Sequence, residues 1–392
     1  MYQMFFRNQE LQRIVRLASR SECTGCNACV TICPKACIQM KEDKEGFLQP
    51  VIDTKSCIKC HKCERVCPVL TPESGEEVFE TKAYAVYNPN DEVRKKSSSG
   101  GVFYTLAEWI LKQGGVVFGA RFDDKWEVTH DYTETLEGLV PFMGSKYVQS
   151  RIGDAYKRAK VFLEKGRWVL FSGTPCQLGG LRTFLGREYD RLLQVDIICY
   201  GVPSPGVWRT YIKERQKRNG EIKSISFRDK REGWRHSHFV VSYDLDHEEL
   251  DGLFMKGFSY KAYLRECCYE CGFRRYHRNS DLTIADYWGV HKLCEEMFDD
   301  KGTSIVFSHS SKGVFALNAI SDSLIIKPQT KQNAIEYNPF MVKAHSITDK
   351  RDRFFRMYRL TSSFEKSSFV IIKDSLRSRV GRRLKEYILR LS

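Results

Sequence analysis

Cysteines with a repeated spacing are the chemically most informative residues of this 392-residue chain. One run of four precedes Pro34 and another precedes Pro68, and each cysteine of the first run recurs after 34 residues. The two runs are Cys23, Cys26, Cys29, Cys33 and Cys57, Cys60, Cys63, Cys67. Thiolates spaced this closely are ligands for soft metals and for iron–sulfur clusters. The pattern therefore indicates redox chemistry near the N-terminus.

The spacing C-x2-C-x2-C-x3-C-P is typical of bacterial ferredoxins, in which three close thiolates bind one 4Fe-4S cluster and the fourth reaches the other cluster. We therefore predict that cluster one is held by Cys23, Cys26, Cys29 and Cys67, and cluster two by Cys57, Cys60, Cys63 and Cys33. Zinc usually takes its ligands as two separated pairs, and disulfides are disfavoured in a reducing compartment. Cys37 lies outside the pattern, and we expect it to pack against the module rather than to bind metal.

Four later cysteines form a second candidate set, Cys176, Cys199, Cys268 and Cys271. The first two each follow an apolar run typical of a strand, and ligands in parallel α/β sheets collect beyond the carboxyl ends of the strands. The set could hold a third 4Fe-4S cluster. Zinc is an alternative, because Cys268-x2-Cys271 is followed by His277. A reactive Cys176 thiolate at a helix start and buried structural cysteines are the other interpretations.

Two loops of small residues precede predicted helices. They comprise Ser98, Ser99, Gly100 and Gly101 in one case and Gly173, Thr174 and Pro175 in the other. The free amides and the dipole at such a helix start bind phosphate well. An ordinary helix start with closely packed glycines explains the first loop equally well.

The elements that must position these residues form an α/β pattern from residue 82 onward, in a chain that is α+β overall. We expect a lead-in helix over 1–20, a two-cluster ferredoxin-type domain over 21–72 and a polar linker over 73–81. A larger α/β domain over 82–345 and a basic helical tail over 346–392 follow. Predicted strands include 83–87, 116–122, 168–171 and 192–199, and predicted helices include 102–111 and 205–219.

Composition and charge indicate the class of protein and its cellular compartment. The chain is 42% hydrophobic and 29% charged, which is typical of a globular protein. No apolar run of 18 residues and no signal peptide occur, so we expect a cytoplasmic protein whose 15 cysteines stay reduced.

The net charge of +14 is concentrated in residues 343–392, where 14 Lys and Arg face 5 Asp and Glu. Residues 367–392 place apolar side chains such as Phe369 on one helical stripe with basic flanks. Such a helix could lie peripherally on the inner face of an anionic membrane, although packing on the domain is the commoner use. No basic–aromatic motif accompanies it, so we expect no nucleic acid as a partner.

Three motifs together resemble the beta-subunit family of coenzyme F420 hydrogenases and dehydrogenases, including members with a fused two-cluster ferredoxin module. They are Ser98-Ser99-Gly100-Gly101-Val102, Gly173-Thr174-Pro175-Cys176-Gln177, and Cys268-x2-Cys271 with Ser280-Asp281-Leu282-Thr283 and Trp288-Gly289. One stretch departs from the family, which usually has Gly-Asp-Phe-Trp-Gly where this chain has Ala285-Asp286-Tyr287-Trp288-Gly289. The resemblance covers about residues 21–307. It implies bound FAD, with the two loops as contacts for its pyrophosphate and isoalloxazine. Lys146 and Arg151 are further candidates for a phosphate or a substrate carboxylate.

We therefore expect an iron–sulfur flavoprotein oxidoreductase that passes electrons between 4Fe-4S clusters and FAD. Its partner would be a soluble hydride carrier, F420-like or other, or a small-molecule organic substrate, and a redox protein is a further possible partner. Lys146, His236 and His238 are the candidate proton donors. The alternatives are an electron-transfer subunit with no substrate of its own and a zinc-stabilised binding protein that uses its basic tail.

Overall fold

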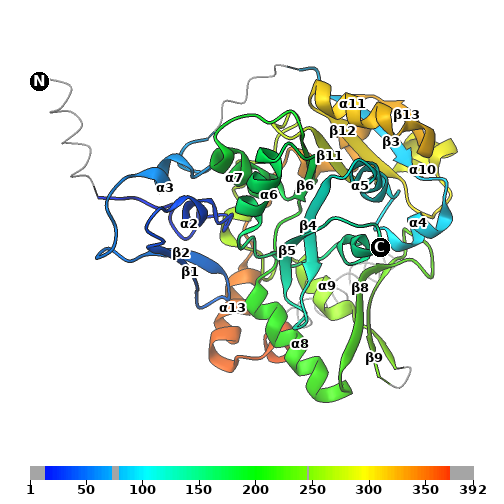
Figure 1. The fold of residues 1–392 in the computed structure, drawn as a ribbon. Helices are drawn as coiled ribbons and strands as arrows, with labels where there is room; N and C mark the ends of the chain where they lie inside the picture. The colour runs from blue at the N-terminus through cyan, green and yellow to red at the C-terminus, as the bar shows by residue number, and fades with distance from the viewer. Residues whose placement is uncertain (1–13, 73–78, 245–246, 371–392) are drawn as a thin grey trace, which may run out of the picture.

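A computed structural model describes residues 14–72, 79–244 and 247–370 of the protein. This part of the chain forms a small N-terminal module beside a larger α/β body (Figure 1). Residues 14–19 of the expected lead-in helix are not helical, and residues 1–13 lie outside the described residues. None of the described helices is long and apolar enough to cross a membrane.

The module consists of two short helices and a hairpin. These are α2 (Ala28–Ile32), β1 (Ile38–Glu42), β2 (Leu48–Ile52) and α3 (Lys62–Arg65). β1 and β2 pair antiparallel, from Ile38 opposite Ile52 to Glu42 opposite Leu48. Each helix starts two residues after the second cysteine of its run, so the sequence repeat is also a structural repeat.

The body is built on an eight-stranded sheet in the order β13-β3-β12-β11-β7-β6-β4-β5. The strands are β3 (Lys82–Tyr87), β4 (Val116–Phe122), β5 (Val128–Thr133), β6 (Val169–Gly173), β7 (Leu192–Ile197), β11 (Leu282–Asp286), β12 (Ser304–Ser308) and β13 (Ile325–Gln329). β4, β6, β7 and β11 run parallel to their neighbours within this group, and the outer strands pair antiparallel. The expected α/β domain is therefore a mixed sheet with a parallel centre.

Helices cover both faces of this sheet because its buried strands alternate their side chains. Val169 and Phe171 of β6 pack into one core, while Leu170 packs into the core on the opposite face. The first core contains α6 (Ala155–Glu164) and α7 (Pro175–Leu185). The second contains α5 (Val102–Lys112) and α11 (Ser311–Ala319).

A second sheet, β10-β9-β8, packs with further helices at the end of the body. The elements are α8 (Pro205–Asn219), β8 (Ile222–Asp229), β9 (His238–Tyr243), β10 (Glu248–Leu250), α9 (Gly252–Ser259) and α13 (Asp349–Thr361). Short helices elsewhere are α4 (Asp91–Lys96), α10 (Val290–Leu293) and α12 (Lys331–Glu336). Phe354 and Phe355 of α13 are buried in the same core as Trp208 and Phe254. The start of the expected tail therefore packs as part of the body, whereas residues 371–392 lie outside the described residues.

Helix α7 joins the body to the module. A Cβ added at Gly180 would lie 3.0 Å from both Cβ and Sγ of Cys26. Three residues later, Thr183 Oγ1 donates to the carbonyl of Val66 at 2.7 Å. The absence of a side chain at Gly180 thus lets α7 lie directly against the first cysteine run.

Candidate functional site

The two cysteine runs enclose two small cavities, and each cavity is lined by three cysteines of one run and by the last cysteine of the other run. Cys23, Cys26 and Cys29 line one cavity together with Cys67 of the second run. The other is lined by Cys57, Cys60, Cys63, Cys33 and Cys37. The structure thus brings together each predicted set of four, and the fourth member of each comes from the other run.

The loop backbone has the same twist in both runs. The residues on either side of the second cysteine have left-handed backbone angles. They are Gly25 (φ 70°), Asn27 (φ 69°), Lys59 (φ 54°) and His61 (φ 54°). This twist turns the amides inward, and the N–H of Gly25 lies 3.4 Å from Cys23 Sγ. Amides that point at sulfur fit an anionic iron–sulfur cluster, whose potential depends on such hydrogen bonds.

The spacing of the sulfur atoms bears on which metal fits. Among the described residues, no three His, Cys, Asp or Glu side chains lie close enough to hold a single metal ion. A 4Fe-4S cluster instead takes one thiolate at each of its four irons. Cys37 is a fifth thiol at the second cavity, with its Sγ 3.4 Å from that of Cys33. Burial, together with the neighbouring Cys33, raises the pKa of Cys37 to about 12.

The later cysteines also gather in one place. Cys176 is the second residue of α7, Cys199 follows β7, and Cys268 and Cys271 belong to the turn after residue 265. Burial raises the pKa of Cys176 well above its usual value, and the nearby Cys271, Cys199 and Cys268 thiols add to this effect. Burial likewise raises the pKa of Cys199 to about 12. Four thiols held this way would need bound cations to become thiolates together. We call them the third cysteine group.

His277, the possible zinc ligand, has other contacts. Its Nδ1 lies 3.1 Å from Thr81 Oγ1, and its ring packs edge-on against His309. His277 and His309 thus share Thr81 Oγ1 as a hydrogen-bond partner.

A hydrogen-bond network fixes the loop that carries Cys176. The N–H of Thr174 donates to Gln177 Oε1 at 2.9 Å, and Gln177 Nε2 donates to Ser150 Oγ at 2.9 Å. Ser150 Oγ lies 2.8 Å from His130 Nδ1, and His130 Nε2 lies 2.9 Å from the carbonyl of Ser172. Because that carbonyl only accepts, the neutral ring carries its proton on Nε2. Burial lowers the pKa of His130 to about 4, so the ring is neutral near pH 7.

A cavity of about 580 Å³ opens beyond the carboxyl ends of β6, β7 and β11. We call it the large cavity. Of the predicted residues, it is lined by Ser98, Ser99, Gly101, Lys146, Gly173, Thr174 and Cys199. Parallel strands place their ligand sites at this edge of a sheet. The structure therefore brings most of the predicted cofactor residues to one cavity.

The remaining predicted residues lie elsewhere. Pro175 lines a smaller cavity on the module side. Arg151 is exposed and pairs with Asp123 and Glu127 at 3.5 and 3.4 Å. His236 and His238 do not line the large cavity, and His238 Nε2 lies 2.8 Å from Glu232 on the surface.

The Ser-Ser-Gly-Gly loop is held to the sheet by its own polar groups. Ser99 Oγ donates to the carbonyl of Thr303 at 2.8 Å, and the N–H of Gly100 donates to Ser304 Oγ at 3.0 Å. A Cβ at Gly100 would lie 2.4 Å from the carbonyl oxygen of Val86, so only glycine fits here. Gly100 therefore packs against the sheet behind the cavity wall and does not itself line the cavity.

Two loops of the cavity wall are joined through Ser98 and Ser145. The N–H of Ser145 donates to Ser98 Oγ at 2.6 Å. Next along the chain, Lys146 Nζ donates to the carbonyls of Pro141 and Met143 at 2.7 and 2.8 Å. Loss of water around this amine lowers the pKa of Lys146 to about 7. Lys146 is thus a cavity residue that exchanges its proton near neutral pH.

Sequence reasoning missed a cationic residue on the cavity wall. Arg228 reaches the large cavity from β8, with its guanidinium 5.1 Å from the ring centre of Trp288 and 3.4 Å from Asp286 Oδ1. Its buried Nε has no hydrogen-bond partner among the described residues. A guanidinium at the cavity wall beside an aromatic ring fits an anionic ligand with a planar ring system, and FAD has both features. The motif that includes Asp286 and Trp288 marked this region, but nothing in the sequence pointed to Arg228.

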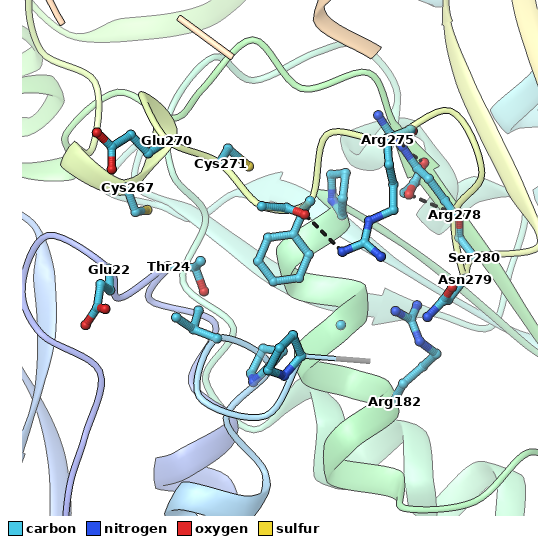
Figure 2. A pocket seen from close by; sticks show the side chains of 18 of the residues that line it. Glu22, Thr24, Arg182, Cys267, Glu270, Cys271, Arg275, Arg278, Asn279 and Ser280 are labelled. Carbon is cyan, nitrogen blue, oxygen red and sulfur yellow. Dashed lines mark hydrogen bonds and ion pairs between the residues drawn. The ribbon is translucent and has the colours of Figure 1, made fainter. Parts of the chain in front are cut away.

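A second cavity of about 250 Å³ lies between the module and the body (Figure 2). Figure 2 shows Cys267 and Cys271 on the side of this interface cavity that faces Glu22 and Thr24 of the module. The third cysteine group therefore lies between the large cavity, which Cys199 lines, and the first cysteine run.

These features define a class of protein: a ferredoxin-type module joined to an α/β body whose large cavity is separated from the module by buried cysteines. Residues 166–333 match the family model for the C terminus of the coenzyme F420 hydrogenase/dehydrogenase beta subunit. Residues 22–70 match a 4Fe-4S dicluster domain. The chain thus resembles this beta-subunit family over residues 166–333 and a dicluster domain over residues 22–70.

Curated relatives match parts of the chain. The F subunit of the F(420)H(2) dehydrogenase of Methanosarcina mazei is 20% identical over 48% of this chain and 56% of its own length. Coenzyme F420-dependent sulfite reductase of Methanocaldococcus jannaschii is 26% identical over 41% of this chain and 24% of its own length. The matches therefore span a quarter to about half of these relatives. A chain of the F420-reducing [NiFe] hydrogenase complex from Methanosarcina barkeri superposes with a TM-score of 0.45 at 17% identity, over 69% of this chain and 88% of that one.

Proposed function

We propose that the protein is an iron–sulfur flavoprotein oxidoreductase. Its 4Fe-4S clusters would exchange electrons with FAD in the large cavity, and FAD with a soluble hydride carrier, F420-like or other, or with a small organic substrate. The eight cysteines of the module would hold two clusters, and the third cysteine group a further one. The matching dicluster and beta-subunit families and the names of the relatives support this proposal.

Helix α7 is the observation that carries the proposal. Its first turn places Cys176 near Cys199, which lines the large cavity, and one turn later Gly180 lies against Cys26 of the module. A single rigid element thus spans the short distance between the cavity and the first cysteine run. Electron transfer requires closely spaced centres, and this arrangement therefore supports the proposal.

The residues of the large cavity have separate roles in this proposal. When bound, FAD supplies the conversion between two-electron and one-electron chemistry. Ser98 and Gly101 would contact its phosphates, and Arg228 would supply a fixed positive charge. Lys146 holds a proton at Nζ whose pKa is about 7, so it could deliver or receive the proton that accompanies a hydride.

Cofactor content and substrate dependence test the proposal. Anaerobic purification should give protein with bound iron, acid-labile sulfide and extractable FAD. Reduced F420, NADH, NADPH and reduced ferredoxin would then be compared as reductants of the bound flavin. Zinc without sulfide would support the metal-stabilised binding protein instead. Flavin that no hydride donor reduces, but that a redox protein does, would support the electron-transfer subunit.

One feature favours a redox protein as a second partner. Lys35, Lys55, Lys59, Lys62 and Arg65 are exposed around the cluster-two cavity, beside Ile58, which is 52% exposed. None of the four lysines forms an ion pair within the described part of the chain. This basic rim, with an apolar residue near its centre, suits a small acidic electron-transfer protein. Its electrons would enter or leave at the end of the module farthest from α7.

A further inference from the structure

Arg265 is a buried guanidinium without a carboxylate partner. Its relative exposure is 1%, and all its hydrogen bonds go to neutral oxygens. Nε donates to the carbonyl of Cys23 at 2.6 Å, and the terminal nitrogens donate to Gln149 Oε1, Leu48 O and Gln49 Oε1, each at 3.0 Å. No ion pair joins it to any residue that the structure describes. A buried charge in this state is costly unless an anion lies nearby.

The other buried arginines show that this situation is exceptional. Arg94, Arg215, Arg278 and Arg351 are equally enclosed, and each pairs with an acidic residue. The pairs are Arg94–Asp299, Arg215–Asp251, Arg278–Asp196 and Arg351–Glu45, at 2.5 to 2.9 Å. Among the described residues, each buried arginine other than Arg265 thus has a carboxylate partner. The negative charge that matches Arg265 must come from elsewhere.

Arg265 also contacts both cysteine sites through its main chain and side chain. Its carbonyl accepts from the N–H of Cys268 at 3.0 Å, and its own N–H donates to the carbonyl of Val202 at 2.9 Å. Its side chain holds the carbonyl of Cys23, and a Cβ on Gly25 would lie 2.8 Å from its terminal nitrogen. Arg265 therefore lies between the first cysteine run and the third cysteine group. Clusters bound by four thiolates carry net negative charge, so both sites would provide the missing anions.

We propose that Arg265 is a positioning residue for electron transfer: it fixes the spacing between cluster one and the third cysteine group, and its charge raises the reduction potential of both centres. This rests on the proposed function, because it needs clusters at these sites. A positive charge stabilises the reduced, more negative form of a cluster. Removing the charge should therefore make both potentials more negative, while cluster two, at the far end of the module, should keep its potential.

Two variants test the role of the charge by different routes. Arg265→Gln removes it, and Gln49→Glu neutralises it in place, because Gln49 Oε1 already accepts from Arg265 at 3.0 Å. Arg265→Lys retains the charge but loses the forked hydrogen bonds. The matched control is Arg351→Gln, which removes a buried guanidinium at the same module–body interface that has its own partner, Glu45.

The readout is a potentiometric titration monitored by electron paramagnetic resonance, with iron and sulfide measured in every sample. For cluster one we expect about a tenfold change in the oxidised-to-reduced ratio at fixed potential in Arg265→Gln and Gln49→Glu, equal to about 59 mV for one electron. Arg265→Lys should keep the potential but weaken the magnetic coupling between cluster one and its neighbour, and Arg351→Gln should change neither. If Arg265→Gln fails to assemble, Gln49→Glu decides. Loaded variants with the potential of the unmodified protein would overturn the inference, whereas an unmodified protein without clusters would overturn the proposed function itself.

Discussion

Replacing Gly180 with alanine should disturb the contact between α7 and cluster one. The new Cβ would lie 3.0 Å from Cys26 Cβ, Cys26 Sγ and Tyr156 Oη, which is closer than nearly all real contacts of this kind. The neighbouring Gly179 leaves little room for α7 to shift, because a Cβ there would lie 2.9 Å from the ring of Phe273. The extra methyl group must therefore push the cysteine loop away.

Two opposing effects determine how much Gly180→Ala changes the free energy of unfolding. Overpacking a filled site costs about 1 to 3 kcal/mol, and alanine gains about 1 kcal/mol over glycine inside a helix. The net loss of stability is thus about 0 to 2 kcal/mol. The matched control is Gly252→Ala at the start of α9, where nothing lies within 4 Å of the added Cβ. That variant should be neutral or more stable by about 0.4 to 1 kcal/mol.

Anaerobic urea unfolding, followed by both cluster absorbance and circular dichroism, measures this difference. We expect Gly180→Ala to lose the absorbance of cluster one at lower urea than the unmodified protein, and Gly252→Ala to match or exceed the unmodified protein. A Gly180→Ala protein with unchanged stability and an unchanged cluster-one spectrum would refute the close packing of α7 on the first cysteine run.

Three further predictions follow from the site. Between pH 6.5 and pH 4, His130 is protonated in the unfolded state before it is protonated in the folded state, so acidification should remove about 3 kcal/mol of stability. In His130→Gln, the free energy of unfolding should lack this part of its dependence on pH. An identical dependence on pH in both proteins would contradict burial of a neutral ring. Cys176→Ser should lower the iron content by about four atoms per chain while the module spectrum persists, and unchanged iron would exclude a third cluster there. The double variant Lys59→Glu with Lys62→Glu should slow reduction by an acidic ferredoxin about tenfold at low salt but not at high salt. An equal effect of the control Lys160→Glu would count against the basic rim as the docking site.

The sequence predicted the exchange of cysteines between the runs because the repeated C-x2-C-x2-C-x3-C-P spacing is typical of bacterial ferredoxins, in which the fourth cysteine reaches the other cluster. The structure places Cys33 with the second run and Cys67 with the first, and ligation of clusters stays a prediction. The gathering of Cys176 and Cys199 followed from a rule about parallel strands. These expectations depended on local spacing or on a general property of sheets.

Other features depend on contacts between distant segments, and the sequence did not reveal them. His130 lies on β5, an antiparallel edge strand that the apolar pattern did not predict. Arg228 reaches the cavity from the second sheet, and nothing in the order of strands indicates how the two sheets pack. The expected boundary at residue 345 rested on charge, whereas Phe354 and Phe355 bury an apolar face in the body core.

The contacts on either side of Cys67 have a consequence for how the protein is made. Val66 accepts a hydrogen bond from Thr183, and Pro68 lies against Gly179. Cys67, the predicted fourth ligand of cluster one, is therefore flanked by contacts with α7, a helix synthesised more than a hundred residues later. If Cys67 completes cluster one, all four ligands leave the ribosome with the module, but the contacts that pack the chain around Cys67 form only after α7 has been synthesised. A chain that ends before α7 would lack these contacts and would hold cluster one less firmly.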